Sequence, residues 1–87
     1  MGDQMGDQVG DRIRAIVGQM SPLGPRVALP EHRMTEDLGF DSLATLELTT
    51  ALEEEFGLEP IDEEVAMEVL TVADLEELIR HSGASAG

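Results

Sequence analysis

Few side chains in this sequence could carry out chemistry. The chain has no cysteine, and its only histidines are His32 and His81. A catalytic serine needs an oriented base beside it, and His81 lies near the end of the last expected helix, which is a poor place for such a base. We therefore expect no catalytic residue and no intrinsic enzyme activity.

Carboxylates are plentiful, but their spacing does not predict a metal site. The runs Glu53–Glu55 and Asp62–Glu64 are consecutive, and consecutive residues on a helix point in different directions. The sequence lacks the glycine-containing pattern of a calcium loop and the glycine-lysine pattern of a phosphate loop. We interpret the acidic runs as solvated helix faces and expect no metal ligand.

Ser42 is the remaining candidate for chemistry. It follows Asp41 and precedes a periodic apolar segment, which is typical of the start of a helix. From this pattern alone, the simplest interpretation of the Ser42 hydroxyl is that it helps to cap that helix.

Apolar periodicity predicts the four helices that must position Ser42. The first ends at Ser21-Pro22. The second begins near Asp41-Ser42 and ends before Gly57, a residue suited to a helix C-terminus. A short third helix begins near Asp62, and the fourth begins at Thr71, where Asp74 completes a capping box. The expected inward stripes are Val9, Ile13, Ile16, Val17 and Met20; Leu48, Leu52 and Phe56; Val65, Val69 and Met67; and Val72, Leu75, Leu78 and Ile79.

The predicted fold is all-α: a small four-helix bundle of three longer helices and one short third helix. A long loop, residues 21–41, separates the first two helices, and we expect apolar residues to pin it across the bundle. Arg12 and Arg14 lie off the first stripe and are expected to be solvated. Residues 1–87 form one domain with a core at about 5–81 and flexible ends at 1–4 and 82–87. We expect several of six apolar residues to do this pinning: Leu23, Val27, Leu29, Met34, Leu38 and Phe40.

The formal net charge is −14, and no Lys or Arg occurs from Met34 to Ile79. Such a field repels nucleic acid and anionic lipid and attracts basic protein surfaces. No apolar run approaches the roughly 20 residues of a membrane span, and no signal segment opens the chain. We expect a cytoplasmic monomer that binds neither nucleic acid nor membrane.

The segment Leu38-Gly39-Phe40-Asp41-Ser42-Leu43 and the acidic helix that ends in Glu55-Phe56-Gly57 closely resemble the acyl carrier protein family. The resemblance extends from about Ile13 to Ile79. It implies that Ser42 receives 4′-phosphopantetheine from coenzyme A, that Asp41 helps to present the serine to the transferase, and that Leu43 contacts the arm. A phosphodiester at Ser42 would gain from the free N–H groups and the dipole of the helix.

The resemblance also implies a non-catalytic carrier of acyl thioesters in polyketide or fatty-acid biosynthesis. Its partners would be a phosphopantetheinyl transferase, an acyltransferase and a ketosynthase with basic docking surfaces. Thr45 and Thr49 would make the gap between helices polar, which favours short or oxygenated acyl groups and hence specialised, antibiotic-type metabolism. The expected partner-binding residues are Leu46, Glu47, Glu53, Glu54, Asp62, Glu63 and Glu64.

Two alternatives remain open from the sequence. A peptidyl or aminoacyl carrier of a nonribosomal pathway resembles the same motif, but such carriers often have Gly-Gly before the serine pair and a less acidic second helix. The Gly39-Phe40 pair and the glutamate runs favour the acyl version. An acidic helical adaptor without a cofactor would bind a basic partner and would not need Ser42.

Overall fold

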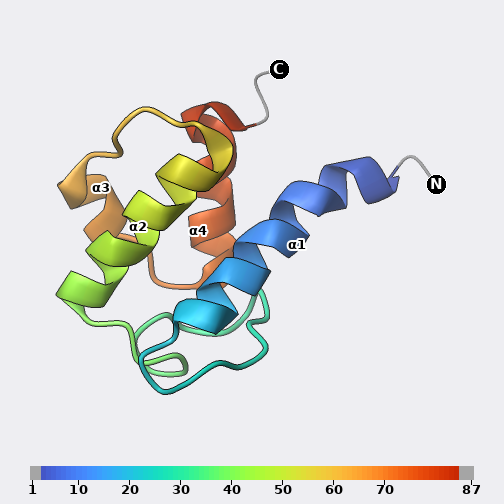
Figure 1. The fold of residues 1–87 in the computed structure, drawn as a ribbon. Helices are drawn as coiled ribbons and strands as arrows, with labels where there is room; N and C mark the ends of the chain where they lie inside the picture. Colours follow the sequence, from blue (N-terminus) through green and yellow to red (C-terminus); the bar gives the residue numbers. More distant parts are fainter. Residues whose placement is uncertain (1–2, 85–87) are drawn as a thin grey trace.

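The computed structural model describes residues 3–84, with side chains from Gln8 to Ser82. No strand is present in this part of the chain, which confirms the predicted all-α class with a short third helix (Figure 1). The elements are α1 (Asp3–Met20), α2 (Ser42–Phe56), α3 (Glu63–Met67), α4 (Val72–Ile79) and a π-helical turn, η1 (Arg80–Ala84).

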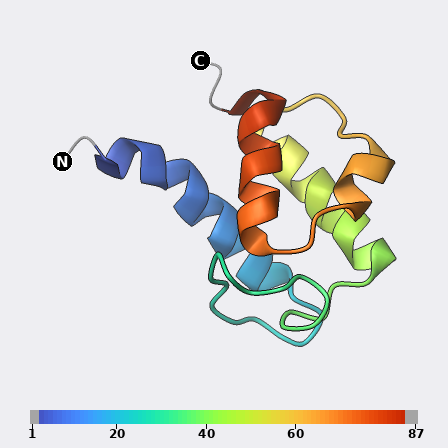
Figure 2. The ribbon, with the colours of Figure 1, turned by 180° about the vertical axis from the view of Figure 1, so that it is seen from behind.

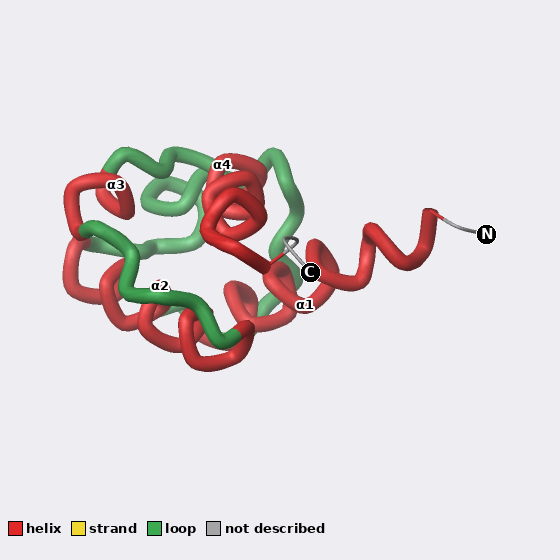
Figure 3. The backbone as a smooth tube through the Cα atoms, turned by 90° about the horizontal axis from the view of Figure 1, so that it is seen from above, coloured by secondary structure: helices red, strands yellow, loops and turns green. Residues whose placement is uncertain are grey.

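Helical structure extends beyond both limits of the predicted core. α1 begins at Asp3, and its first turns project away from the bundle (Figures 1 and 3). η1 continues α4 as far as Ala84. Residues 1–2 and 85–87, which belong to the ends predicted to be flexible, lie outside the described residues.

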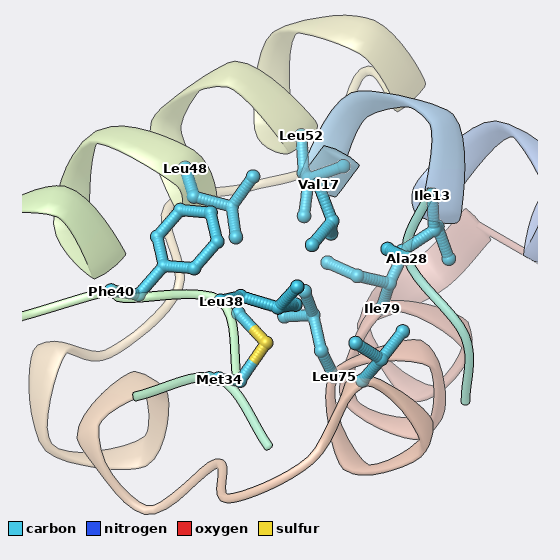
Figure 4. Packing of buried hydrophobic residues seen from close by; sticks show 11 residues of the cluster. Ile13, Val17, Ala28, Met34, Leu38, Phe40, Leu48, Leu52, Leu75 and Ile79 are labelled. Atoms are coloured by element: carbon cyan, nitrogen blue, oxygen red, sulfur yellow. The ribbon is translucent and has the colours of Figure 1, made fainter. Parts of the chain in front are cut away.

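The second half of α1 packs with α2 and α4, while α3 lies beside α2 on the side away from α1 (Figures 1 and 3). The long loop between α1 and α2 runs across one end of the bundle (Figure 2). One apolar cluster fills the centre, and it contains residues of this loop as well as of the helices (Figure 4). Its members are Ile13, Val17, Ala28, Met34, Leu38, Phe40, Leu48, Leu52, Val72, Leu75 and Ile79.

The loop is pinned by several of the six apolar residues, as predicted. Met34, Leu38 and Phe40 are buried, whereas Leu23, Val27 and Leu29 are exposed. Between the last two, the small Ala28 is buried. The backbone places Ala28 inward and its larger neighbours outward, so residue size alone did not identify the inward side chain.

Backbone hydrogen bonds fasten the same loop to the start of α4. The Met34 N–H donates to the carbonyl of Leu70 at 2.9 Å, and the Val72 N–H donates to the carbonyl of His32 at 3.0 Å. Nearer to α2, the Phe40 N–H donates to the carbonyl of Met34 at 2.9 Å. These bonds set the position of the segment that leads directly into α2.

The predicted helix ends are confirmed where local capping determines them. Gly57 follows α2 in the left-handed region at φ 65°, which a glycine adopts without strain. Asp62 caps α3 by accepting from the Glu64 N–H at 2.9 Å. Thr71 and Asp74 form the predicted capping box of α4.

The predicted inward face of the third helix is wrong. Val65 and Met67 are 41% and 39% exposed, and Ala66 is the buried residue of α3. The reason is the length of α3, which ends at Met67, so that Val69 is not on the helix and does not share a face with Val65. Val69 packs against the core from the connection that follows.

Arg14 was expected to be solvated, and this is also wrong. Its side chain is 24% exposed and donates to Glu76, which is 8% exposed, at 2.9 Å; it also pairs with Asp11. Burial lowers the pKa of Arg14, but the hydrogen bonds and charges of Glu76 and Asp11 outweigh this effect and raise the pKa above its ordinary value. Arg12, by contrast, is exposed and pairs with Glu55.

Glu76 is a buried acid that the sequence motifs do not single out. It lies four residues after Val72 and three before Ile79, and therefore shares the inward face of α4. This spacing was the available signal. The carboxylate is reached from α1 by Arg14 and from η1 by Arg80, at 3.7 Å.

Candidate functional site

Asp41 is the N-cap residue of α2. Its backbone is extended, and its side chain accepts from the Ala44 N–H at 2.8 Å. Ser42 is therefore the first residue inside the helix. The interpretation of the Ser42 hydroxyl as a helix cap is wrong, because the neighbouring carboxylate performs that function.

The Ser42 side chain is exposed to solvent. Within residues 3–84, no hydrogen bond from the protein holds its hydroxyl. The first N–H groups of a helix have no partner within the helix, and Asp41 occupies that of Ala44. An oxygen atom bonded to phosphorus at Ser42 would therefore lie at the positive end of α2, close to the backbone donors of its first turn.

A shallow hollow of about 280 Å³ adjoins Ser42. The loop contributes Met34 and Phe40 to it, α2 contributes Thr45, and α3 contributes Ala66 and Met67. These residues come from three separate segments of the sequence, so the hollow could not be predicted from the motif around Ser42. The hollow is also lined by three hydroxyl side chains, Thr35, Ser42 and Thr45, and by the Asp41 carboxylate. This mixture of apolar and polar walls suits a flexible arm that lies against the protein.

Thr49 does not contribute to this hollow, although it was expected to line the gap between helices beside Thr45. Thr49 is buried, and its hydroxyl donates to the carbonyl of Leu46 in its own helix at 2.9 Å. Of these two threonines, Thr45 alone therefore lines the hollow, while the hydroxyl of Thr49 is satisfied locally.

The predicted contact residues on α2 lie on one exposed face. Leu43 is 66% exposed, and Glu47 and Glu54 are also exposed. Positions 43, 47 and 54 are separated by four and seven residues and so share a face of the helix. Leu46 is half-buried beside them. We call this the α2 face: Leu43, Leu46, Glu47 and Glu54.

The acidic residues Asp62, Glu63 and Glu64 stand at the start of α3, which packs beside α2. Asp62, Glu63 and Glu64 are all exposed. Asp62 also caps its helix, and acids in the first turn stabilise a helix through its dipole. These three carboxylates therefore have a local structural role in addition to any contact with a partner.

Glu53, which was expected on the same surface, differs from the other acids. It is half-buried, and its carboxylate accepts from the Ile61 N–H at 2.7 Å. The bond holds the connection between α2 and α3. The residue is eight positions from its donor, and nothing in the local sequence indicates this pairing.

No group of three or more His, Asp or Glu side chains in the described part of the chain is arranged to hold a metal ion. None of its helices combines the length and the apolar character that crossing a membrane requires.

Comparisons with known proteins agree with this geometry. The family model described as "Phosphopantetheine attachment site" matches residues 11–79. The chain is 42% identical over 74 residues to an acyl carrier protein of Thermosynechococcus vestitus, which covers 85% of this chain and 90% of that protein.

A solved structure shares the fold: the acetyl actinorhodin acyl carrier protein from Streptomyces coelicolor, in solution. The TM-score is 0.70 and the identity is 31%, over 88% of this chain and 92% of that one. The open hydroxyl of Ser42, the N-terminal donors of α2 and the adjoining hollow all fit a covalently attached phosphate arm. The chain therefore belongs to the acyl carrier protein family, whose members are non-catalytic carriers with a covalent 4′-phosphopantetheine arm.

Proposed function

We propose that Ser42 is the residue that carries the 4′-phosphopantetheine arm. The observation that carries the proposal is that the Ser42 hydroxyl is exposed at the first position of α2 and has no hydrogen-bond partner among the described residues. Asp41 is held beside it by the Ala44 N–H, so the carboxylate keeps a fixed position next to the serine. Both residues lie within the segment that matches the family.

Attachment replaces the Oγ–H bond of Ser42 with an Oγ–P bond. The phosphorus–oxygen bond to the adenosine bisphosphate half of coenzyme A breaks, and that half leaves while the transferase accepts the serine proton. The new phosphodiester is negatively charged, and the N-terminal end of α2 stabilises such a charge. The thiol at the far end of the arm then holds the acyl group as a thioester, which explains why the chain itself needs no cysteine.

We propose that the cargo is a short or oxygenated acyl group, as in polyketide biosynthesis, and that fatty-acid biosynthesis is the closest alternative. The supporting observation is the closed centre of the bundle. Phe40, Leu48 and Leu52 are at most 1% exposed, so no open channel leads from the hollow at Ser42 into the core. A long saturated chain would have to displace packed side chains, at a cost of the kind seen when cores are overpacked.

The partners that we propose are a phosphopantetheinyl transferase, an acyltransferase and a ketosynthase, which would dock on the α2 face and the acidic start of α3. Exposed Glu47 and Glu54 lie on the same helix face as Leu43, both on its C-terminal side, and opposite charge on the enzyme would steer the encounter. Weak, rapidly reversed docking suits a monomer that visits several enzymes in the cytoplasm. Glu53 is not in this docking set, because its carboxylate is engaged with the Ile61 N–H.

The test is the intact mass after incubation with coenzyme A and a broad-specificity phosphopantetheinyl transferase. We expect the mass of one phosphopantetheine to be gained, and we expect Ser42→Ala to gain nothing. The matched control is Ser82→Ala, which removes a hydroxyl that donates to Leu78 and should leave loading unchanged.

A wild-type chain that gains no mass, or a Ser42→Ala variant that still gains it, would contradict the proposal. Loaded protein can then be offered to malonyl transferases and to amino-acid-adenylating enzymes. Acceptance of amino acids alone would indicate a peptidyl or aminoacyl carrier instead of an acyl carrier.

A further inference from the structure

A second hollow of about 430 Å³ adjoins the one beside Ser42, because Thr35 and Val69 line both. Its remaining walls are Arg33 and Glu36 from the long loop and Leu70 and Thr71 from the connection between α3 and α4. The two hollows therefore lie next to each other on the outside of the bundle. We call the pair of hollows the Arg33 groove; Ser42 lines one of them and Arg33 lines the other.

The floor of the groove near Ser42 is closed. Met34 and Phe40 line it, yet they are only 3% and 1% exposed because they pack into the core. A group tethered at Ser42 therefore meets a wall in the inward direction. One path that keeps contact with the protein passes Thr35 and Val69 into the second hollow.

The second hollow combines an apolar surface with one cation, Arg33, and one carboxylate, Glu36. Leu70 is 69% exposed, which is unusual for a leucine beside a cavity and leaves its side chain available to cover an arm. Arg33 is the only Lys or Arg that lines either hollow. The hydroxyls of the two threonines are already engaged, since Thr35 donates to Phe40 and Thr71 accepts from the Asp74 N–H.

Arg33 is paired with Glu36 at 2.6 Å, and both side chains are mostly exposed. Exposed ion pairs of this kind are weak and readily exchanged. A guanidinium group can bind a second carboxylate through two parallel hydrogen bonds. The charged residues closer to Ser42 are acidic: Asp41 is the N-cap of α2, and Glu47 lies on α2. They would repel a negatively charged cargo.

We propose that the Arg33 groove binds acyl groups that end in a carboxylate, such as the malonyl group, with Arg33 paired to that carboxylate and Leu70 covering the arm. The inference rests on the attachment at Ser42 proposed above. Acyl groups without a terminal charge would not be held at Arg33. The groove would thus distinguish a dicarboxylic extender group from a neutral acyl group while both are attached to the same serine.

The experiment attaches hydrolysis-stable malonyl and acetyl arms to Ser42 and compares the amide spectra of the two loaded proteins. We expect the amides of residues 33–36 and 69–71 to shift about twice as much with malonyl as with acetyl, because only the former can pair with Arg33. Arg33→Gln should remove this difference. Arg26→Gln is the matched control, since Arg26 hydrogen-bonds to carbonyls of its own loop and lines neither hollow of the groove.

Glu36→Gln removes the carboxylate that already pairs with Arg33. This variant should therefore increase the malonyl-dependent shifts. Three outcomes would overturn the proposed binding in the Arg33 groove while intact mass still showed loading. They are equal shifts with both arms, shifts confined to the hollow beside Ser42, and a malonyl–acetyl difference that is unchanged in Arg33→Gln. A wild-type chain that gains no mass would overturn the attachment at Ser42 itself. The spectra of the unloaded variants, unchanged away from the substitution, serve as the check that each variant is folded.

Discussion

The two sides of the bundle are held together in different ways. On one side, α1 and α4 share fully buried aliphatic residues, among them Ile13, Val17 and Leu75, and a largely buried ion pair between Arg14 and Glu76. On the other side, α3 places one small residue, Ala66, against the rest of the protein and leaves Val65 and Met67 exposed. The first side has the features of a rigid scaffold.

This difference coincides with the location of the candidate site. Ser42, the hollow beside it and the acidic start of α3 all lie on the lightly packed side. Regions with few buried apolar contacts open at lower free energy than the packed core. A carrier that must expose its cargo to one enzyme after another benefits from this division, in which stability is provided by α1 and α4 and mobility is available near the attachment point.

The largest expected effect compares the same substitution on buried and exposed leucines. Leu75→Ala should lower the free energy of unfolding by about 2–5 kcal/mol, because it leaves a cavity in the core. Leu70→Ala, in an exposed side chain five residues earlier, should change it by no more than about 0.5 kcal/mol. Urea unfolding followed by circular dichroism measures both. Similar losses in the two variants would contradict the division between the two sides.

The next effect concerns the buried ion pair. Glu76→Ala should lower the free energy of unfolding by about 1–3 kcal/mol, because the largely covered Arg14 loses its main partner. Glu77→Ala, which changes the exposed neighbour, should have an effect within about 0.5 kcal/mol. The loss of unfolding free energy in Glu76→Gln should lie between those of the two alanine variants, since the glutamine side chain can still accept a hydrogen bond. Thermal and urea unfolding would give these values, and equal effects of the two alanine variants would rule out a structural role for the pair.

This contribution should not depend on pH in the ordinary range as far as Arg14 is concerned. The pKa of Arg14 is raised in the folded protein. The corresponding stabilisation is therefore fully present below the ordinary arginine pKa and is lost only as the pH rises through the raised value.

A smaller effect compares the caps of α4 and α3. Thr71→Ala removes one half of the capping box and should lower the free energy of unfolding by about 1 kcal/mol. Asp62→Ala removes the cap of α3, a helix with little buried surface, and should lower it by less than about 0.5 kcal/mol. Hydrogen exchange should nevertheless show faster exchange of the α3 amides in Asp62→Ala. A larger loss of unfolding free energy in Asp62→Ala than in Thr71→Ala would contradict the assignment of stability to α1 and α4 rather than to α3.

Elements whose signals are local were predictable from the sequence. Gly57 ends α2, and Thr71 with Asp74 begins α4, as expected, because a cap depends on residues three or four positions apart. The stripes of α1 and of α4 were also correct for their buried members, since each helix is long enough for its period to be read. The family motif indicated the exposed Ser42.

Features that depend on distant segments were not predictable in this way. The burial of Arg14 requires Glu76 from the other end of the chain, and the engagement of Glu53 requires Ile61. The inward face of α3 could not be read from its period, because five residues make little more than one turn. The Arg33 groove joins the loop to the connection before α4, a juxtaposition set by the backbone bonds between those segments.

The smallest effect concerns charge. The arginines at positions 12, 14, 33 and 80 each pair with a carboxylate. Arg12 and Arg14 lie on α1, Arg80 lies on η1, and Arg33 lies in the loop. From Met34 to Ile79 there is no basic residue, so α2 and α3 carry unbalanced negative charge. Added salt shortens the range of repulsion to about 10 Å at 0.1 M ionic strength. We expect moderate salt, or a low concentration of divalent cations, to raise the melting temperature by a few degrees, measured by circular dichroism.

Neutralising part of the acidic cluster sharpens this last prediction. The double variant Glu63→Gln/Glu64→Gln should respond less to salt than the wild-type protein, because two exposed carboxylates that repel their neighbours are gone. Hydrogen exchange at low and moderate salt should show the largest gain in protection in α3 and a smaller gain where α1 meets α4. A melting temperature that stays constant or falls as salt is added would mean that the ion pairs lost to screening outweigh the repulsion. In that case the acidic side would not be the electrostatically weaker part of the bundle.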